Sequence, residues 1–307
     1  MKKYLPIIVV ILVLASFAYI VVEKKKLQQP NAGVNEVYNI GTFVPSKNCA
    51  KLPNFLQKLH IPQPVMIDLS QKKYKGIALL FDKGFSRALH PKQWEQYGHF
   101  STYALDDKGN IYLVPTPFIS IEPTTFNLQK NIYKVDTNTG KVSIFMHLDD
   151  VHPASDNPYG INAIVYDCED KTLWVAAIDE SDYQSQKGVI YHINLQTKEI
   201  MQKIEGFDVL SMTLLKSKQG KYLLLGSARD NGLYAYNMHT KEKPKKILEL
   251  PSANEHIRKI KIKSANRLEL QSIPFSYTLI AQTAEKYRTL YDLKWDFKKM
   301  KWEIVKQ

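Results

Sequence analysis

The pattern of apolar and polar positions divides the chain into one long apolar run and a larger region of short apolar stretches separated by polar turns. Residues 5–22 carry no charge and are almost all apolar. A helix of this length spans roughly 27 Å, close to the hydrocarbon thickness of a bilayer. The run predicts either an uncleaved signal anchor or a signal peptide cleaved after Ala18. Because the apolar run continues to Val22, an anchor fits better.

The rest of the chain repeats one template of four strands. The first two strands are joined by a tight polar turn, a variable loop follows, and the third and fourth strands are joined by a second polar turn. Four copies occupy residues 101–148, 162–204, 211–250 and 257–305. The third strands align on Tyr133, Tyr191, Tyr234 and Tyr291, which are followed three residues later by Asp136, Asn194, Asn237 and Lys294. The expected turns after these strands are 137–141, 195–199, 238–242 and 297–301. Aspartate and asparagine favour such turns.

Four antiparallel strands in each repeat are typical of a β-propeller blade. Apolar segments at 65–69 and 76–81 predict a further, diverged blade, and residues 35–44 predict a strand that completes the last blade. The sequence therefore predicts an all-β propeller of five or six blades behind one N-terminal transmembrane or signal helix. The expected organisation is 1–22 as signal anchor or signal peptide, 23–36 as flexible stalk and 37–307 as propeller.

The net charge of +12 is concentrated at the two ends of the chain. Residues 240–307 hold 16 basic and 8 acidic residues, whereas residues 36–239 hold 21 of each. A basic last blade could contact anionic headgroups or remain a solvated face. Nucleic acid is not an expected partner, because no stripe of interleaved basic and aromatic residues is present.

The template, and especially NPYGINAIVYDCEDKTLWVA at 157–176, resembles the NHL-repeat and gluconolactonase-like propellers, which usually have six blades. The lactonase-like members bind one divalent metal at the channel mouth through Glu, Asn and Asp residues. The resemblance places the asparagine at Asn162 or Asn157 and the aspartate at Asp230. It finds no counterpart of the glutamate.

Loop lengths distinguish the two faces of the predicted propeller. The turns between strands one and two, and between strands three and four, are uniformly short. The loops between strands two and three, and between blades, are long and rich in polar and aromatic residues. Function usually lies where long loops gather on a rigid scaffold, so we expect a ligand at the channel mouth on the long-loop face.

Candidate ligand-binding residues in these loops combine cationic, aromatic and oxygen-bearing side chains. They are Arg87, His90, Trp94, Tyr97, His99, Asp156, Asn157, Tyr159, Arg229, Asp230, Asn231, Glu255 and His256. Loop packing, local pairing and turn formation are the alternative roles for these residues. One divalent cation, Ca²⁺ or Zn²⁺, could bind Asp156, Asn162 and Asp230. The two cysteines, Cys49 and Cys168, either pair in an oxidising compartment or remain two buried thiols.

The phosphate-binding loop, the dinucleotide fingerprint, the HExxH zinc motif and the nucleophile elbow are all absent from the sequence. The leading hypothesis is an exported, membrane-anchored propeller, periplasmic or extracellular, that holds a protein, peptide or glycan on its long-loop face. Secretion after signal cleavage is the alternative location. A metal-dependent lactonase-like hydrolase and a structural member of an envelope complex are the alternative functions.

Overall fold

The computed structural model describes residues 38–44, 49–70, 72–117, 126–278 and 287–306. The predicted helix at 5–22 and the predicted stalk at 23–36 lie outside the described residues. Residues 38–307 form one structural unit. Within the described ranges, no helix is long and apolar enough to cross a bilayer.

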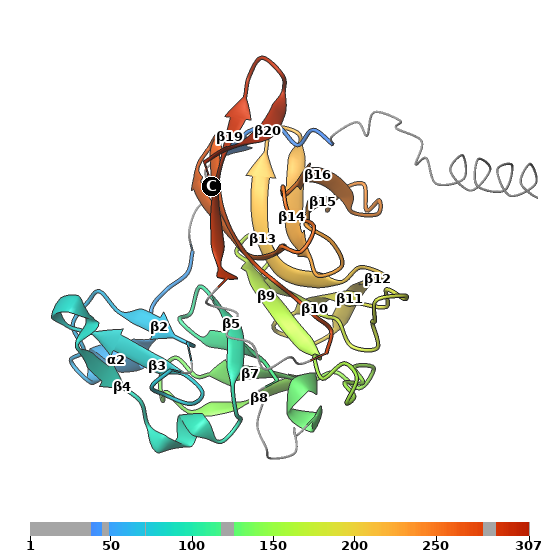
Figure 1. The fold of residues 1–307 in the computed structure, drawn as a ribbon. Coiled ribbons are helices and arrows are strands. Elements are labelled where there is room, and N and C mark those ends of the chain that lie inside the picture. Colours follow the sequence, from blue (N-terminus) through green and yellow to red (C-terminus); the bar gives the residue numbers. More distant parts are fainter. Residues whose placement is uncertain (1–37, 45–48, 71, 118–125, 279–286, 307) are drawn as a thin grey trace, which may run out of the picture. The chain divides into compact units, whose positions relative to one another are not determined.

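The unit is a five-bladed β-propeller, and each blade is one antiparallel sheet (Figure 1). Blade 1 contains β2 (Met66–Asp68), β3 (Ala78–Phe81) and β4 (Arg87–Leu89). Blade 2 contains β5 (Phe100–Leu105), β6 (Ile111–Pro115), β7 (Asn131–Val135) and β8 (Val142–His147). Blade 3 contains β9 (Ile161–Asp167), β10 (Thr172–Ala177), β11 (Val189–Asn194) and β12 (Ile200–Glu205).

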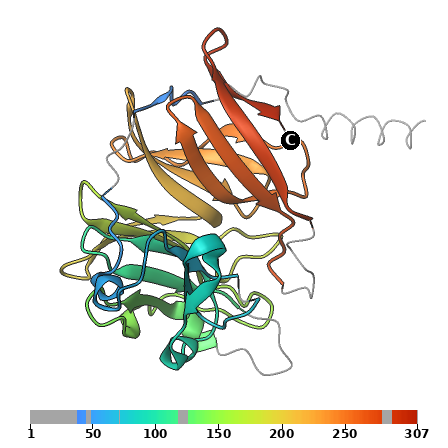
Figure 2. The same cartoon turned by 90° about the vertical axis from the view of Figure 1, so that its left-hand side faces the viewer.

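The last two blades have the same order of strands. Blade 4 contains β13 (Val209–Ser217), β14 (Gly220–Ser227), β15 (Gly232–Asn237) and β16 (Lys245–Glu249). Blade 5 contains β17 (His256–Ser264), β18 (Arg267–Ile273), β19 (Thr289–Asp296) and β20 (Lys301–Lys306), and Figure 2 shows this orange and red sheet face-on. Short helices occur at α2 (Asn54–Lys58), η1 (Lys83–Phe85), η2 (Lys92–Glu95) and η3 (Phe126–Lys130).

The predicted repeats are confirmed as blades 2 to 5, and the diverged segments form blade 1. The four aligned tyrosines lie on the third strand of each blade, and Asp136, Asn194 and Asn237 each accept hydrogen bonds from two backbone N–H groups of the following turn. The fourth expected turn, at 297–301, is confirmed to within one residue between β19 and β20. Asp296, and not Lys294, accepts the equivalent bonds from Lys298 and Lys299, because β19 continues at least two residues further beyond its tyrosine than the other third strands do.

The segment before blade 1 does not complete the last blade, which takes all four strands from the end of the chain. Instead, β1 (Phe43–Val44) pairs with the end of β13 in blade 4. The Phe43 ring stacks on Trp302 of blade 5 with a centroid distance of 4.7 Å. The segment therefore fills the junction between blades 4 and 5.

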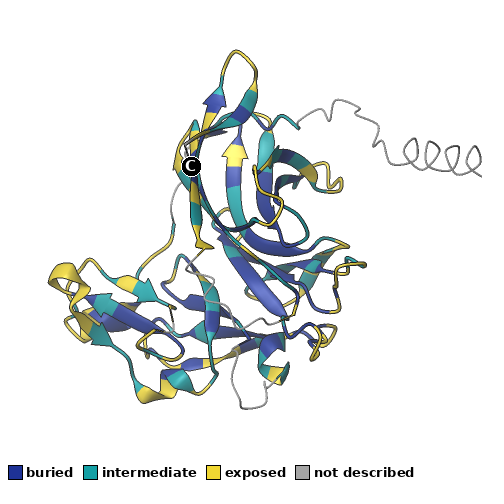
Figure 3. Ribbon diagram, in the orientation of Figure 1, coloured by how far each residue is buried: buried dark blue, intermediate teal, exposed yellow. Residues whose placement is uncertain are grey.

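Apolar side chains fill the interfaces between successive blades, so that the strands are mostly buried while the turns are exposed (Figure 3). Close approach depends on glycine at one point between blades 4 and 5. A Cβ on Gly226 would lie 2.3 Å from the Ile257 carbonyl oxygen and 2.5 Å from Ser211 Oγ. Any side chain at this position would push the two blades apart.

A disulfide joins Cys49, which precedes blade 1, to Cys168 in the β9–β10 turn of blade 3, with a Cα–Cα distance of 5.9 Å. The bridge closes a sequence separation of 119 residues. It ties the chain entering the propeller to the short-turn end of the third blade.

Candidate functional site

The long loops of blades 3, 4 and 5 contact one another, as expected for one functional face. Arg229, between β14 and β15, donates hydrogen bonds to backbone carbonyls of the β10–β11 loop, including a 2.7 Å bond to Tyr183. The Tyr183 hydroxyl lies 2.6 Å from the hydroxyl oxygen of Ser276 in the β18–β19 loop. These bonds hold three loops from three blades against each other.

A pocket of about 580 Å³ lies among these loops, and we call it the loop-face pocket. Its lining residues are Tyr183, Ala228, Arg229, Ala253, Asn254, His256, Pro274, Phe275, Tyr277 and Tyr287. Tyr183 and Tyr287 are 66% and 53% exposed. Tyrosine and arginine side chains at the rim of a concave site are typical of surfaces that bind peptides and other flexible ligands.

Two buried titratable side chains, Asp208 and His256, lie at this pocket: Asp208 bonds to the lining residue Tyr277, and His256 is part of the lining. Asp208 accepts hydrogen bonds from Ser181, from the backbone of Gly188 and from the Tyr277 hydroxyl. Burial raises the pKa of the Asp208 carboxyl, while these hydrogen bonds oppose the rise. His256 is also buried, and burial lowers the pKa of its imidazole. Its Nδ1 atom has no hydrogen-bond partner among the described residues.

A central channel of about 710 Å³ runs between the innermost strands of all five blades. Residues of β2, β5, β9, β13 and β17 line it, together with residues next to these strands. The lining includes the cationic side chains Arg258, Lys259 and Arg288, and it includes no aspartate or glutamate among the described residues. The channel is therefore a cation-lined cavity.

The innermost strands of blades 2 to 5 each contain a β-bulge at the same place, near the long-loop end. The extra residue in each bulge has no partner in the neighbouring strand, and we call the four together the bulge ring. They are Ser101, Asn162, Leu210 and Arg258. Bulges re-aim side chains and are common beside functional sites. Ser101, Leu210 and Arg258 line the channel.

Hydrogen bonds link the members of the bulge ring across blades. Arg258 Nη2 donates to the Ser101 carbonyl oxygen at 3.1 Å, and Ser101 Oγ donates to the Asn162 carbonyl oxygen at 3.1 Å. Asn162 Nδ2 donates to the Val209 carbonyl oxygen at 2.7 Å, while Asn162 Oδ1 is buried without a partner among the described residues. Three of the four members are therefore connected by hydrogen bonds, and Asn162 keeps an acceptor that no described residue uses.

Sequence reasoning missed Arg258, although a signal was present. The stretch from Lys259 to Lys263 alternates between charged and apolar residues, and Arg258 lies two residues before Ile260, in the phase of the half-buried Ile260 and Ile262. A charged residue is unexpected at a position where an innermost strand otherwise carries half-buried apolar side chains. An alignment of the four repeats at the bulge would have marked Arg258 as the counterpart of Ser101, Asn162 and Leu210.

The predicted candidates of blade 1 do not form one site. Trp94 is fully buried and donates from Nε1 to the Gly140 carbonyl oxygen at 2.8 Å, so it joins blade 1 to blade 2. His90 lies 2.8 Å from the Ile77 carbonyl oxygen. Tyr97 packs on the ring of Tyr133. Of the two remaining candidates, Arg87 is exposed beside Asp82, and His99 is partly buried, which lowers the pKa of its imidazole.

The predicted candidates in the loops of blades 3 to 5 fall into two groups: some lie at the loop-face pocket, and others make contacts that hold the fold together. Arg229 and His256 line the loop-face pocket, and Tyr159 packs on Phe275 at its edge with a centroid distance of 5.3 Å. Of the remaining five, Asp156 is exposed and the other four have structural contacts. Asn157 holds two carbonyls of blade 3, Asn231 bonds to the Leu250 carbonyl, Asp230 bonds to Tyr234 and Lys246, and Glu255 accepts from Thr289 and Tyr291.

The predicted metal ligands do not fit a divalent cation. Asp230 Oδ2 accepts the Tyr234 hydroxyl at 2.6 Å and lies 3.0 Å from the Lys246 ammonium. Asp156 is exposed and bonds to the backbone of the next residue. In the described ranges, no three histidine, cysteine, aspartate or glutamate residues form a group that could hold a metal. The Asp230 carboxylate is already used within the fold, and the exposed Asp156 does not join it and Asn162 in one group of ligands.

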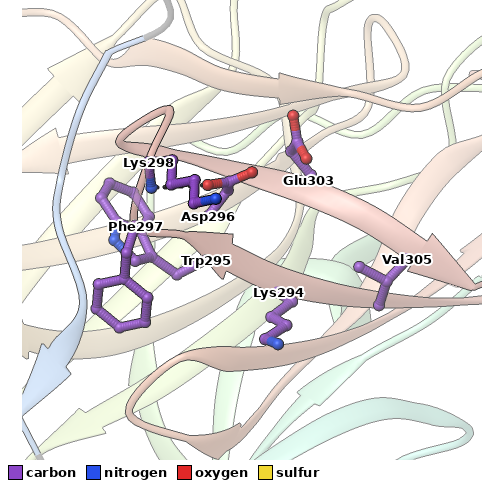
Figure 4. Close-up of a pocket in the computed structure, with 7 residues that line it drawn as sticks. All are labelled: Lys294, Trp295, Asp296, Phe297, Lys298, Glu303 and Val305. Carbon is purple, nitrogen blue, oxygen red and sulfur yellow. Dashed lines mark hydrogen bonds between the residues drawn. The ribbon is translucent and has the colours of Figure 1, made fainter.

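A groove of about 380 Å³ lies on the β19–β20 hairpin (Figure 4). Its lining combines lysines, acidic residues and apolar side chains, and Phe297 is 64% exposed. Asp296, inside the groove, accepts backbone hydrogen bonds of the hairpin turn. The Asp296 carboxylate therefore holds the turn, and the exposed apolar and lysine side chains of the groove offer a contact surface.

Comparisons with known proteins add little beyond the fold. No family model matches the chain, and no curated protein matches it. Similar solved structures include a hypothetical selenium-binding protein from Sulfolobus tokodaii, with a TM-score of 0.47, 11% identity and coverage of 79% of this chain and 62% of that one. An oligogalacturonate lyase in complex with manganese has a TM-score of 0.43, 13% identity and coverage of 79% and 62%.

An acylaminoacyl peptidase from Pyrococcus horikoshii has a TM-score of 0.37, 11% identity and coverage of 76% of this chain and 36% of its own. This chain therefore spans less than two thirds of the length of each of these proteins. The expected resemblance to propeller proteins holds at the level of the fold, with five blades in place of the six that are usual for the lactonase-like group.

Proposed function

We propose that the protein is an exported, membrane-tethered binding module whose long-loop face holds a peptide or glycan. The observation that carries the proposal is the loop-face pocket, where loops from three blades present Tyr183, Tyr287 and Arg229 on a buried support. Such side chains give large contact areas at low conformational cost. The volume of the pocket lies within the range of ordinary ligand sites.

Two features support export and proximity to a membrane. The Cys49–Cys168 disulfide suits an oxidising compartment. The β19–β20 hairpin carries exposed Phe297 and Met300 among four lysines, a composition that favours contact with anionic headgroups. The apolar run at 5–22 supplies the tether in this proposal.

Metal-dependent lactone hydrolysis is less well supported, because the carboxylate that the resemblance assigns to the metal is bound to Lys246 and Tyr234. A structural role in an envelope complex remains compatible with the binding module, which would then hold a neighbouring protein.

The experiment probes peptide and glycan arrays with the full-length chain in detergent, in three forms: wild type, Tyr183→Ala and Phe297→Ala. Phe297 is an equally exposed aromatic residue on a different surface, so it is the matched control. We expect ligands retained by the wild type and by Phe297→Ala, with binding at least tenfold weaker in Tyr183→Ala. The proposal fails if no array ligand binds, or if Tyr183→Ala and the wild type bind equally.

A further inference from the structure

The central channel is lined by a cation, Arg258, that has no counter-charge among the described residues. The Arg258 guanidinium is enclosed by protein, while its side chain keeps partial access to the channel that it lines. Among the described residues, it donates one hydrogen bond, to the Ser101 carbonyl oxygen, and no carboxylate pairs with it. A guanidinium has five N–H donors, so this one bond leaves it with capacity to bind a ligand in the channel that Arg258 lines.

An unpaired charge at this depth carries a large desolvation cost. Burial lowers the pKa of the Arg258 guanidinium, and the nearby Tyr159 phenol opposes this shift. Arginine nevertheless stays protonated in proteins, so the group cannot escape the cost by losing its proton. Proteins meet such a cost by pairing the charge or by exposing it to bound water or ligand.

The other charged residues that line the channel are also positive. Lys259 and Arg288 also line the cavity, and no acidic residue of the described ranges does so. Cations gathered on low-dielectric walls concentrate anions inside a cleft. Hydroxyl and amide groups from Ser101, Thr213 and Gln271 add hydrogen-bonding partners for a polar ligand. The cavity of about 710 Å³ is large enough for an organic molecule.

We propose that the central channel is a binding site for a small polycarboxylate, with one carboxylate held by the guanidinium of Arg258 at the bulge ring. The planar fork of arginine matches a carboxylate in a bidentate arrangement. Lys259 and Arg288 balance the further carboxylates of the ligand. This site is separate from the loop-face pocket, so it stands or falls independently of the proposed function.

The test titrates the full-length protein with citrate at low ionic strength by isothermal calorimetry, beside acetate and inorganic phosphate. The variants are Arg258→Gln, Arg258→Lys and Arg288→Gln, with Arg87→Gln as the control at an exposed arginine outside the channel. We expect citrate to bind the wild type and Arg87→Gln equally, and to bind Arg258→Gln at least tenfold more weakly. Arg258→Lys should be intermediate, because it keeps the charge and loses the fork.

Thermal unfolding without added anion provides a second readout. Because Arg258→Gln removes an unpaired buried charge, its unfolding temperature should equal or exceed that of the wild type. Citrate should then raise the unfolding temperature of the wild type more than that of the variant. If Arg258→Gln does not fold, Arg288→Gln carries the test through weaker citrate binding. The proposal is overturned if citrate does not bind the wild type, if Arg258→Gln and Arg288→Gln bind it as the wild type does, or if phosphate binds more tightly than citrate.

Discussion

Removal of the disulfide should produce the largest loss of stability that substitutions outside the core can cause. The bridge between Cys49 and Cys168 closes a sequence separation of 119 residues. In the chain-entropy model, a closed loop of this size lowers the entropy of the unfolded chain by about 16 cal/mol/K, or about 5 kcal/mol at 25 °C. The double variant Cys49→Ser/Cys168→Ser should therefore lose about 5 kcal/mol of unfolding free energy.

The assay is equilibrium unfolding in urea, with intrinsic fluorescence as the probe and the free energy taken from linear extrapolation. The slope of the unfolding free energy against urea concentration should be steeper in the double variant, because its unfolded chain is less compact. Chemically reduced wild type should behave like the double variant, which separates loss of the bridge from the effect of serine. A stability change below about 1 kcal/mol, or two free thiols in the purified wild type, would refute the reasoning.

Three further predictions test the packing and the titration of the fold. Gly226→Ala should cost about 1–3 kcal/mol in urea unfolding, because its Cβ would meet the Ile257 carbonyl oxygen; an unchanged stability would contradict this. Trp94→Phe should cost about 1–3 kcal/mol by leaving the Gly140 carbonyl without its donor, and a neutral result would show that Trp94 does not join the blades. Burial lowers the pKa of His256, so the stability of the fold that holds this imidazole neutral is complete above about pH 6.5 and declines as the pH falls below it. His256→Asn should therefore flatten the decline in unfolding free energy below that pH, and an unaltered slope would contradict the prediction.

The repeats could be predicted because each blade is a local structure with its own signals. Turn residues such as Asp136 and Asn194 act on the backbone a few residues away, so their role is visible in the sequence. In the last copy the turn was placed correctly, but Asp296 takes the role that position Lys294 has in the alignment, because β19 is longer than its counterparts. The role of residues 38–44 was also missed, because the pairing of β1 with β13 is decided by packing between distant segments.

The candidate site was predicted less well, because side-chain roles depend on contacts between blades. Trp94 and Asp230 have the chemistry of ligand-binding residues, yet both are used inside the fold. Arg229 and His256 were assigned to the long-loop face by loop length alone, and the structure brings both to one pocket. Arg258 was overlooked, since its importance arises from the bulge and from the absence of acidic residues across the described channel wall.

The most direct test of the account asks which face of the propeller meets a ligand. A photo-crosslinking amino acid is placed in the full-length chain at Tyr183 and Tyr287 on the long-loop face, or at Lys171 and Lys241 in the short turns, all of them exposed. Adducts formed in the living cell are then identified by mass spectrometry. The account predicts adducts from the two tyrosine positions and none from the two lysine positions. Adducts from the lysine positions alone, or from both faces equally, would contradict it.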